Sequence, residues 1–114
     1  MKISPISESI YTIELSGRFD AHVAPDFAQK VDALKTSKQN YLIVNLANVS
    51  FIDSTALAAL VRSMKHYREN HGELYIVELQ NSVRIIFELT RMDRAFSIFP
   101  AAANALADIQ ANNK

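Results

Sequence analysis

The sequence contains no cysteine and no tryptophan, and it has only two glycines and three prolines among 114 residues. Without cysteine, disulfide bonds, thiolate metal sites and a cysteine nucleophile are excluded. No stretch approaches the roughly 18 consecutive apolar residues that span a membrane. An excess of one charge is also missing, because 12 basic residues balance 12 acidic ones. We therefore expect neither direct nucleic-acid binding nor membrane insertion.

Length and composition indicate one folded domain. A chain of this length can bury about two-thirds of the surface that it exposes when unfolded. Hydrophobic residues make up 49% and charged residues 21%, which is typical of a globular protein. The opening segment "MKISPISES" lacks the apolar region of a secretory signal. We expect a free-standing, soluble, cytoplasmic protein with a single domain over residues 1–114.

Several segments have the hydrophobic pattern of β-strands. "IYTIELSG" alternates apolar and polar residues, which predicts a half-buried strand that ends at Gly17. "YLIVNL" and "ELYIVEL" are apolar on both faces, as is typical of central strands in a parallel sheet. "FSIF" predicts a short last strand. Connections are expected at "RFDAHV", residues 18–23, and at "ANVSFID", residues 47–53.

Two long segments have the spacing of amphipathic helices. The first has Pro25 and Asp26 in its first turn and closes at "KTSKQN", residues 35–40. The second follows residue 53, carries apolar residues at positions i, i+3, i+4 and i+7, and ends at "NHG". Gly72 is the expected residue just beyond the end of this helix, where a left-handed backbone is common.

Two shorter helices complete the pattern and define the fold class. Asn81 is the predicted N-cap of a short third helix. A fourth helix follows Pro100, and we expect the tail "QANNK" to fray. Strands and helices alternate from residue 23 onward. This order predicts an α/β domain with a mixed, mostly parallel sheet of four to five strands, about four helices, and the first, hairpin-like strands at one edge.

Three small polar residues stand where a strand gives way to a helix. In "SFIDSTALAALV" they are Asp53, Ser54 and Thr55. All three are preferred N-caps, and replacing such a cap by alanine costs about 1 kcal/mol. A single cap needs only one of them, so the others are available for a second role. In α/β proteins, ligands and partners gather where a strand's carboxyl end meets a helix N-terminus.

The segment "FIDSTALAAL" resembles the signature of the STAS domain, which is found in the anti-sigma factor antagonists of bacteria. In that family an Asp-Ser-Ser/Thr-Gly-Leu segment opens the second major helix. The earlier family segment G-x-[FL]-D is similar to "GRFDAHVAPDF", residues 17–27. The order of elements agrees over essentially the whole chain. The resemblance implies a STAS fold and a binding protein that is no enzyme and uses neither cofactor nor metal.

The resemblance also implies a mechanism. Ser54 matches the serine that a partner phosphorylates, and this partner is a serine kinase that also acts as an anti-sigma factor. The unphosphorylated form binds the anti-sigma factor and frees the sigma factor, and a serine phosphatase restores it. Asp20, Asp53 and Thr55 match positions near this serine and join the expected partner-binding set. Ala56 belongs to the same set, although the family usually has glycine there, and it adds a methyl group near the phosphorylation site.

Two other functions stay open. STAS-like domains also serve as constitutive, unphosphorylated subunits of transporters or of larger signalling complexes. Asp20, His22 and Ser54 could form a hydrolytic set, although no Gly-x-Ser-x-Gly elbow and no oxyanion-hole glycines are present. His66 and His71 are five residues apart and do not share a helix face, so no metal site is expected.

Overall fold

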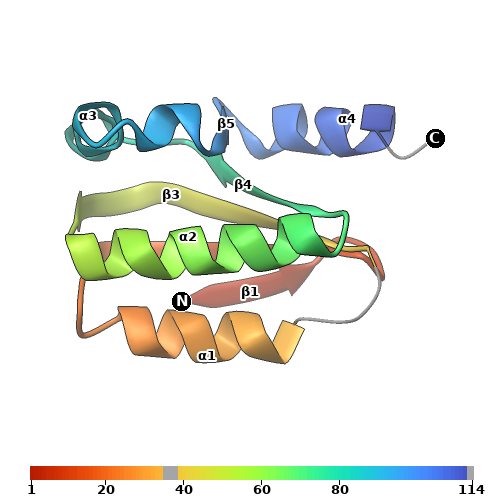
Figure 1. Cartoon of the computed structure of the whole chain (residues 1–114), viewed down its shortest axis with the longest axis horizontal. Coiled ribbons are helices and arrows are strands. Elements are labelled where there is room, and N and C mark those ends of the chain that lie inside the picture. Colours follow the sequence, from red (N-terminus) through yellow and green to blue (C-terminus); the bar gives the residue numbers. More distant parts are fainter. Residues whose placement is uncertain (35–38, 113–114) are drawn as a thin grey trace.

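The computed structural model describes residues 1–34 and 39–112, which form a five-stranded sheet with helices on both faces (Figure 1). The strands are β1 (Lys2–Pro5), β2 (Ile10–Phe19), β3 (Tyr41–Ile52), β4 (Glu73–Val77) and β5 (Ser97–Phe99). The helices are α1 (Ala24–Leu34), α2 (Ser54–Glu69), α3 (Asn81–Leu89) and α4 (Ala102–Asn112), with the short 3-10 helix η1 (Met92–Arg94) before β5.

The strands lie in the order β1-β2-β3-β4-β5. Strand β1 runs antiparallel to β2, and all other neighbours are parallel. The predicted α/β domain with a mixed, mostly parallel sheet and a hairpin at one edge is therefore confirmed.

Two apolar clusters attach the helices to the two faces of the sheet. The larger cluster holds α1, α2 and α3 through buried residues such as Phe27, Leu60 and Phe87. The smaller cluster lies on the other face, where Ile109 of α4 packs with Ile43 of β3. Helices α1, α2 and α3 directly follow the parallel strands β2, β3 and β4. All three helices therefore begin at the same end of the sheet, where these strands have their carboxyl ends.

Strands β2 and β3 both run further than their patterns predicted. Strand β2 passes through Gly17 and ends at Phe19, and β3 continues through the expected connection to Ile52. The pairing of β2 with β3 shifts register twice after Glu14, and each shift places one extra residue in β3. Such bulges break the alternation on which the strand prediction depended. They bring the end of β3 directly to the start of α2.

The C-terminus of α2 also differs from the prediction. The left-handed residue is His71, with a φ of 64°, and not Gly72. The His71 N–H donates to the Arg68 carbonyl oxygen at 3.1 Å, and the Gly72 N–H donates to that of Tyr67 at 2.8 Å. This pair of bonds is a Schellman motif. Glycine is needed at position 72 for another reason, because a Cβ there would lie 1.8 Å from the carbonyl oxygen of Asn40.

Three other predictions concern the ends of helices. Asn81 is the first residue of α3, and the N-cap is Gln80, whose side chain makes no capping hydrogen bond. The tail that was expected to fray is helical up to Asn112. Most of the segment expected to close α1, residues 35–38, lies outside the described residues.

We expect Gly72→Ala to lower the free energy of unfolding by at least about 2 kcal/mol, because the added methyl group must push the backbone apart. Gly17→Ala is a matched control. Gly17 has a φ of +80° but nothing within 4 Å of an added Cβ. Gly17→Ala should therefore lower the free energy of unfolding by only about 1 kcal/mol, the cost of an alanine in a left-handed backbone conformation. Urea denaturation measures both losses. Equal losses in the two variants would contradict the close approach of Gly72 to Asn40.

A second prediction concerns alkaline pH. Burial raises the pKa of Tyr67 from 10.0 to about 12. The folded state therefore keeps this proton where the unfolded chain has lost it, so the stability is complete below pH 10 and falls as the pH rises toward 12. Tyr67→Phe should reduce the alkaline loss by about 2 kcal/mol. Denaturation curves at increasing pH test this, and an unchanged alkaline loss in the variant would refute it.

Candidate functional site

The site is built around the carboxylate of Asp53, at the end of the sheet where the parallel strands finish and the first three helices begin. One carboxylate oxygen, Oδ1, accepts the backbone N–H of Ala56 at 2.9 Å and so caps α2. The other, Oδ2, accepts the backbone N–H of Ala21, also at 2.9 Å. The N–H of Asp53 itself donates to the Phe19 carbonyl oxygen at 3.3 Å. Asp53 therefore fixes the start of α2 and the β2–α1 loop to one another.

Asp20 has a corresponding position at the start of α1. Its Oδ1 accepts the backbone N–H of His22 at 3.0 Å, and its carbonyl oxygen accepts the N–H groups of Val23 and Ala24. The Nε of Arg18 lies 3.6 Å from the other carboxylate oxygen. Two of the residues expected at the site, Asp20 and Asp53, thus order the two segments that border Ser54.

Ser54 and Thr55 are the first two residues of α2, and both are exposed. The capping role falls to Asp53 alone, so neither hydroxyl is needed to cap the helix. Within residues 1–34 and 39–112, the Ser54 hydroxyl makes no hydrogen bond. A hydroxyl without an internal partner at a helix N-terminus is open to modification and to contact by another molecule.

Ala56 is placed differently from the expectation. Its side chain is fully buried and belongs to the large cluster under α1, α2 and α3. It lies one helical turn before Leu60, on the side of α2 that faces the sheet. Its methyl group therefore fills the core, and a direct contact of this methyl group with a partner does not fit the structure.

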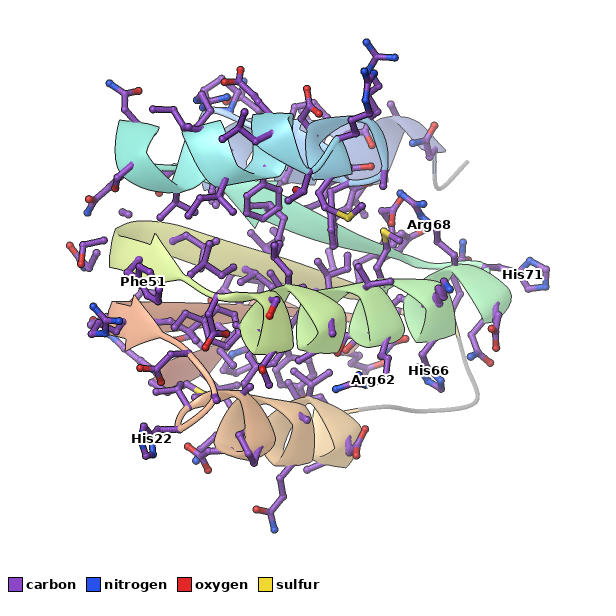
Figure 2. All side chains as sticks on the ribbon, turned by 60° about the vertical axis from the view of Figure 1, so that its left-hand side comes forward. His22, Phe51, Arg62, His66, Arg68 and His71 are labelled. Atoms are coloured by element: carbon purple, nitrogen blue, oxygen red, sulfur yellow. The ribbon has the colours of Figure 1, made fainter. Side chains whose placement is uncertain are left out.

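Arg18 and Phe51 were missed by the sequence analysis. The guanidinium carbon of Arg18 lies 4.0 Å from the centre of the Phe51 ring, a cation–π contact. The two residues are paired across the parallel strands β2 and β3, and Figure 2 shows Phe51 at the edge where α2 begins. Each lies two residues before one of the aspartates, but the register that pairs them follows from two shifts between β2 and β3, and the sequence alone gives no signal for it.

The hydrolytic set is not assembled. Asp20 bonds the backbone N–H of His22 and not its ring, and Figure 2 shows His22 pointing outward from its loop, away from α2. No hydrogen bond between described residues joins His22 to Ser54, so within the described residues no histidine is placed as a general base for this hydroxyl. Among the described residues there is also no group of three His, Asp or Glu side chains arranged to hold a metal ion. None of the described helices combines the length and the hydropathy needed to cross a membrane.

The chain is thus a mixed α/β domain with an exposed serine at the capped start of its second helix. Residues 2–105 match the family model of the STAS domain, and the chain belongs to that family. The anti-sigma-B factor antagonist of Staphylococcus aureus (strain NCTC 8325 / PS 47) is 29% identical over 83 residues, which are 73% of this chain and 77% of that protein.

Solved structures share the fold. The anti-sigma factor antagonist from Mycobacterium paratuberculosis aligns over 96% of this chain and 92% of its own with a TM-score of 0.82 at 22% identity. The anti-sigma factor antagonist SpoIIAA in its unphosphorylated form aligns over 97% of both chains with a TM-score of 0.71 at 16% identity. The phosphorylated form of Bacillus SpoIIAA covers 94% of this chain and 96% of its own, with a TM-score of 0.72 and 16% identity.

A similar fold also occurs inside a transporter. The murine Solute Carrier 26 family member A9 anion transporter aligns over 91% of this chain but only 18% of its own length, with a TM-score of 0.72 at 22% identity. The chain is thus a STAS domain that is similar to the anti-sigma factor antagonists of bacteria.

The double hydrogen bond of Asp53 leads to a graded prediction. Asp53→Asn keeps one carbonyl oxygen and should lower the free energy of unfolding by about 1 kcal/mol, whereas Asp53→Ala loses both bonds and should cost about 2 kcal/mol. Asp93→Asn, at an exposed position of η1, removes the same charge as a control. Urea denaturation gives the stabilities, and the NMR shift of the Ala21 amide reports the loop contact. An Ala21 amide that is unchanged in Asp53→Ala would contradict this role.

Proposed function

We propose that this protein binds an anti-sigma factor through the surface around Ser54 and that phosphorylation of Ser54 switches the binding off. The partner is an anti-sigma factor with serine kinase activity, and a serine phosphatase removes the phosphate. The single observation that carries the proposal is the exposed Ser54 hydroxyl, free of internal hydrogen bonds among the described residues, at the start of α2. Asp20, Asp53 and Thr55 border it and complete the contact surface.

A phosphate at this position is compatible with the fold. It adds about −1.5 to −2 charges at pH 7, and the N-terminus of a helix favours negative charge by roughly 0.3–1 kcal/mol. The carboxylates of Asp20 and Asp53 oppose it, but Ser54 is exposed and solvent screens this repulsion. The similar TM-scores of unphosphorylated and phosphorylated SpoIIAA against this chain, 0.71 and 0.72, support a switch that leaves the fold in place.

The same phosphate is incompatible with a closed interface. A partner that covers Ser54 removes the solvent that screens the phosphate from the two carboxylates. A buried charge without a partner costs several kcal/mol. Because about 4.1 kcal/mol separates micromolar from millimolar affinity, one phosphate is enough to abolish a regulatory complex. The switch therefore acts on binding and not on folding.

In this proposal the protein is a substrate of its partner and catalyses no reaction. It needs neither metal nor cofactor and acts in the cytoplasm. Phosphoryl transfer moves the γ-phosphoryl group of ATP, bound by the kinase, to Ser54 Oγ, with ADP and the hydroxyl proton released. The hydrolytic alternative loses support from the separation of His22 and Ser54 described above.

A second function is favoured by the fold shared with the anion transporter. There the domain would be a constitutive subunit of a larger assembly, and Ser54 would stay unmodified. The two functions differ in one observable, the phosphate itself. Intact-mass and peptide mass spectrometry of the protein from its native cells distinguish them, and they also show whether Thr55 carries phosphate in place of Ser54.

We expect Ser54→Asp to weaken binding of the purified anti-sigma factor at least tenfold, because an interfacial charge without a partner is costly. Ser54→Ala should bind within about threefold of the wild type and accept no phosphate on that residue. Ala103→Asp, on the exposed side of α4, adds the same charge as a control. Calorimetric titration measures the affinities, and circular dichroism checks that all variants are folded. Wild-type affinity of Ser54→Asp would refute the switch.

A further inference from the structure

Helix α3 carries two neighbouring apolar side chains that the fold leaves uncovered. Ile85 is 53% exposed and Leu89 is 79% exposed, while Val83 and Phe87 of the same helix are fully buried. Ile85 and Leu89 are four residues apart, so they lie one turn apart on the same side of α3. We call this pair the α3 ridge. A single exposed leucine is common, whereas contiguous exposed apolar surface is a feature of protein–protein contact sites.

Helix α3, which carries the ridge, begins beside the segment that leads to Ser54. The Ser82 hydroxyl, in the first turn of α3, donates to the Ser50 carbonyl oxygen at 3.1 Å. The Gln80 side chain donates to the Ala47 carbonyl oxygen at 2.7 Å. These two bonds attach the start of α3 to the last residues of β3, just before Ser54. Figure 1 shows α2 and α3 beginning at the same edge of the sheet. The first turn of α3 is therefore held beside the last residues of β3, at the end of the sheet where Ser54 also lies.

The charges around the ridge indicate the chemistry of the partner. Arg84, Arg91 and Arg94 lie on α3 and on the turn that follows it, and none of them forms an ion pair with another described residue. The acids in the same segment are Glu88 and Asp93. Three guanidinium groups against two carboxylates favour a partner with an apolar surface and an acidic rim. A second copy of this chain would present the same excess of guanidinium groups and not an acidic rim.

We propose that the α3 ridge is a second contact region for the protein that covers Ser54, and that this protein offers it an apolar surface with an acidic rim. This inference rests on the proposed function. It divides the interface into two parts. The Ser54 part carries the charge switch, and the ridge contributes affinity that does not depend on phosphorylation.

Site-specific photo-cross-linking tests the inference in cells. A benzophenone amino acid replaces, in separate variants of the full chain, Leu89 of the ridge, Ala58 one turn after Ser54, and Ala107 of α4. All three positions are exposed. Ala107 is the control because α4 covers the opposite face of the sheet. Mass spectrometry identifies the cross-linked proteins, and the informative result is whether two positions capture the same protein.

The expected result is one protein captured from both Leu89 and Ala58 and not from Ala107. Capture from Ala58 alone overturns the role of the ridge and leaves the proposed function standing. Capture of this chain itself from Leu89 also overturns it, because a second copy would then cover the ridge. Failure at both positions overturns the ridge together with the proposed partner.

Affinity measurements with the captured protein, once purified, complete the test. The double variant Ile85→Ser, Leu89→Ser should weaken binding at least tenfold, as is usual for central apolar contacts. Ile6→Ser is the matched control, since Ile6 is 45% exposed but lies next to β1, and it should change the affinity by less than about twofold. Equal affinities of the double variant and the control would overturn the inference. Circular dichroism confirms that both are folded.

Discussion

The carboxylate of Asp53 joins two backbone segments that are 32 residues apart in the sequence. Each of its oxygens accepts one N–H group, from Ala21 in one segment and from Ala56 in the other. Both amides would otherwise lack a partner, since the first N–H groups of a helix have none and loops rarely supply their own. A charged acceptor makes these bonds stronger than neutral ones. The shape of the surface around Ser54 follows from this arrangement, because the β2–α1 loop and the first turn of α2 cannot move apart without losing it.

In this arrangement the residues that hold the fold, Asp53 and Asp20, differ from Ser54, the residue proposed to be modified. Asp53 caps α2, and Asp20 orders the start of α1. The hydroxyl of Ser54 makes no hydrogen bond to another described residue, so a chemical change at this oxygen should change the free energy of unfolding little. The neighbouring Ala56 is buried and holds the first turn against the core. An exposed residue whose hydroxyl makes no hydrogen bond to another described residue thus lies between two fixed residues, which is the geometry that the proposed switch requires.

The sequence predicted the fold class and the start of α2 well, because both depend on local patterns. Alternation of strands and helices defined the sheet, and Asp53, Ser54 and Thr55 marked the start of α2. The burial of Ala56 could also have been predicted, since it lies four residues before the buried Leu60.

Features that depend on the register between strands could not be read from the sequence. The extra residues in β3 and the stacking of Arg18 on Phe51 arise from the way β2 pairs with β3. We did not predict the left-handed conformation of His71, because glycine is the usual residue in that conformation. In this protein the glycine is the next residue, Gly72, where the backbone passes close to Asn40 and leaves no room for a Cβ.

The placement of α4 has a consequence for how the domain can be joined to another polypeptide. This helix packs on the face of the sheet opposite α1, α2 and α3. Figure 1 shows the last turn of α4 and the beginning of α2 toward opposite ends of the view. A polypeptide or tag joined after α4 would therefore extend away from the serine. The same recognition surface can then operate on an isolated domain and on one tethered to a larger assembly, with no change in the geometry that a binding protein meets.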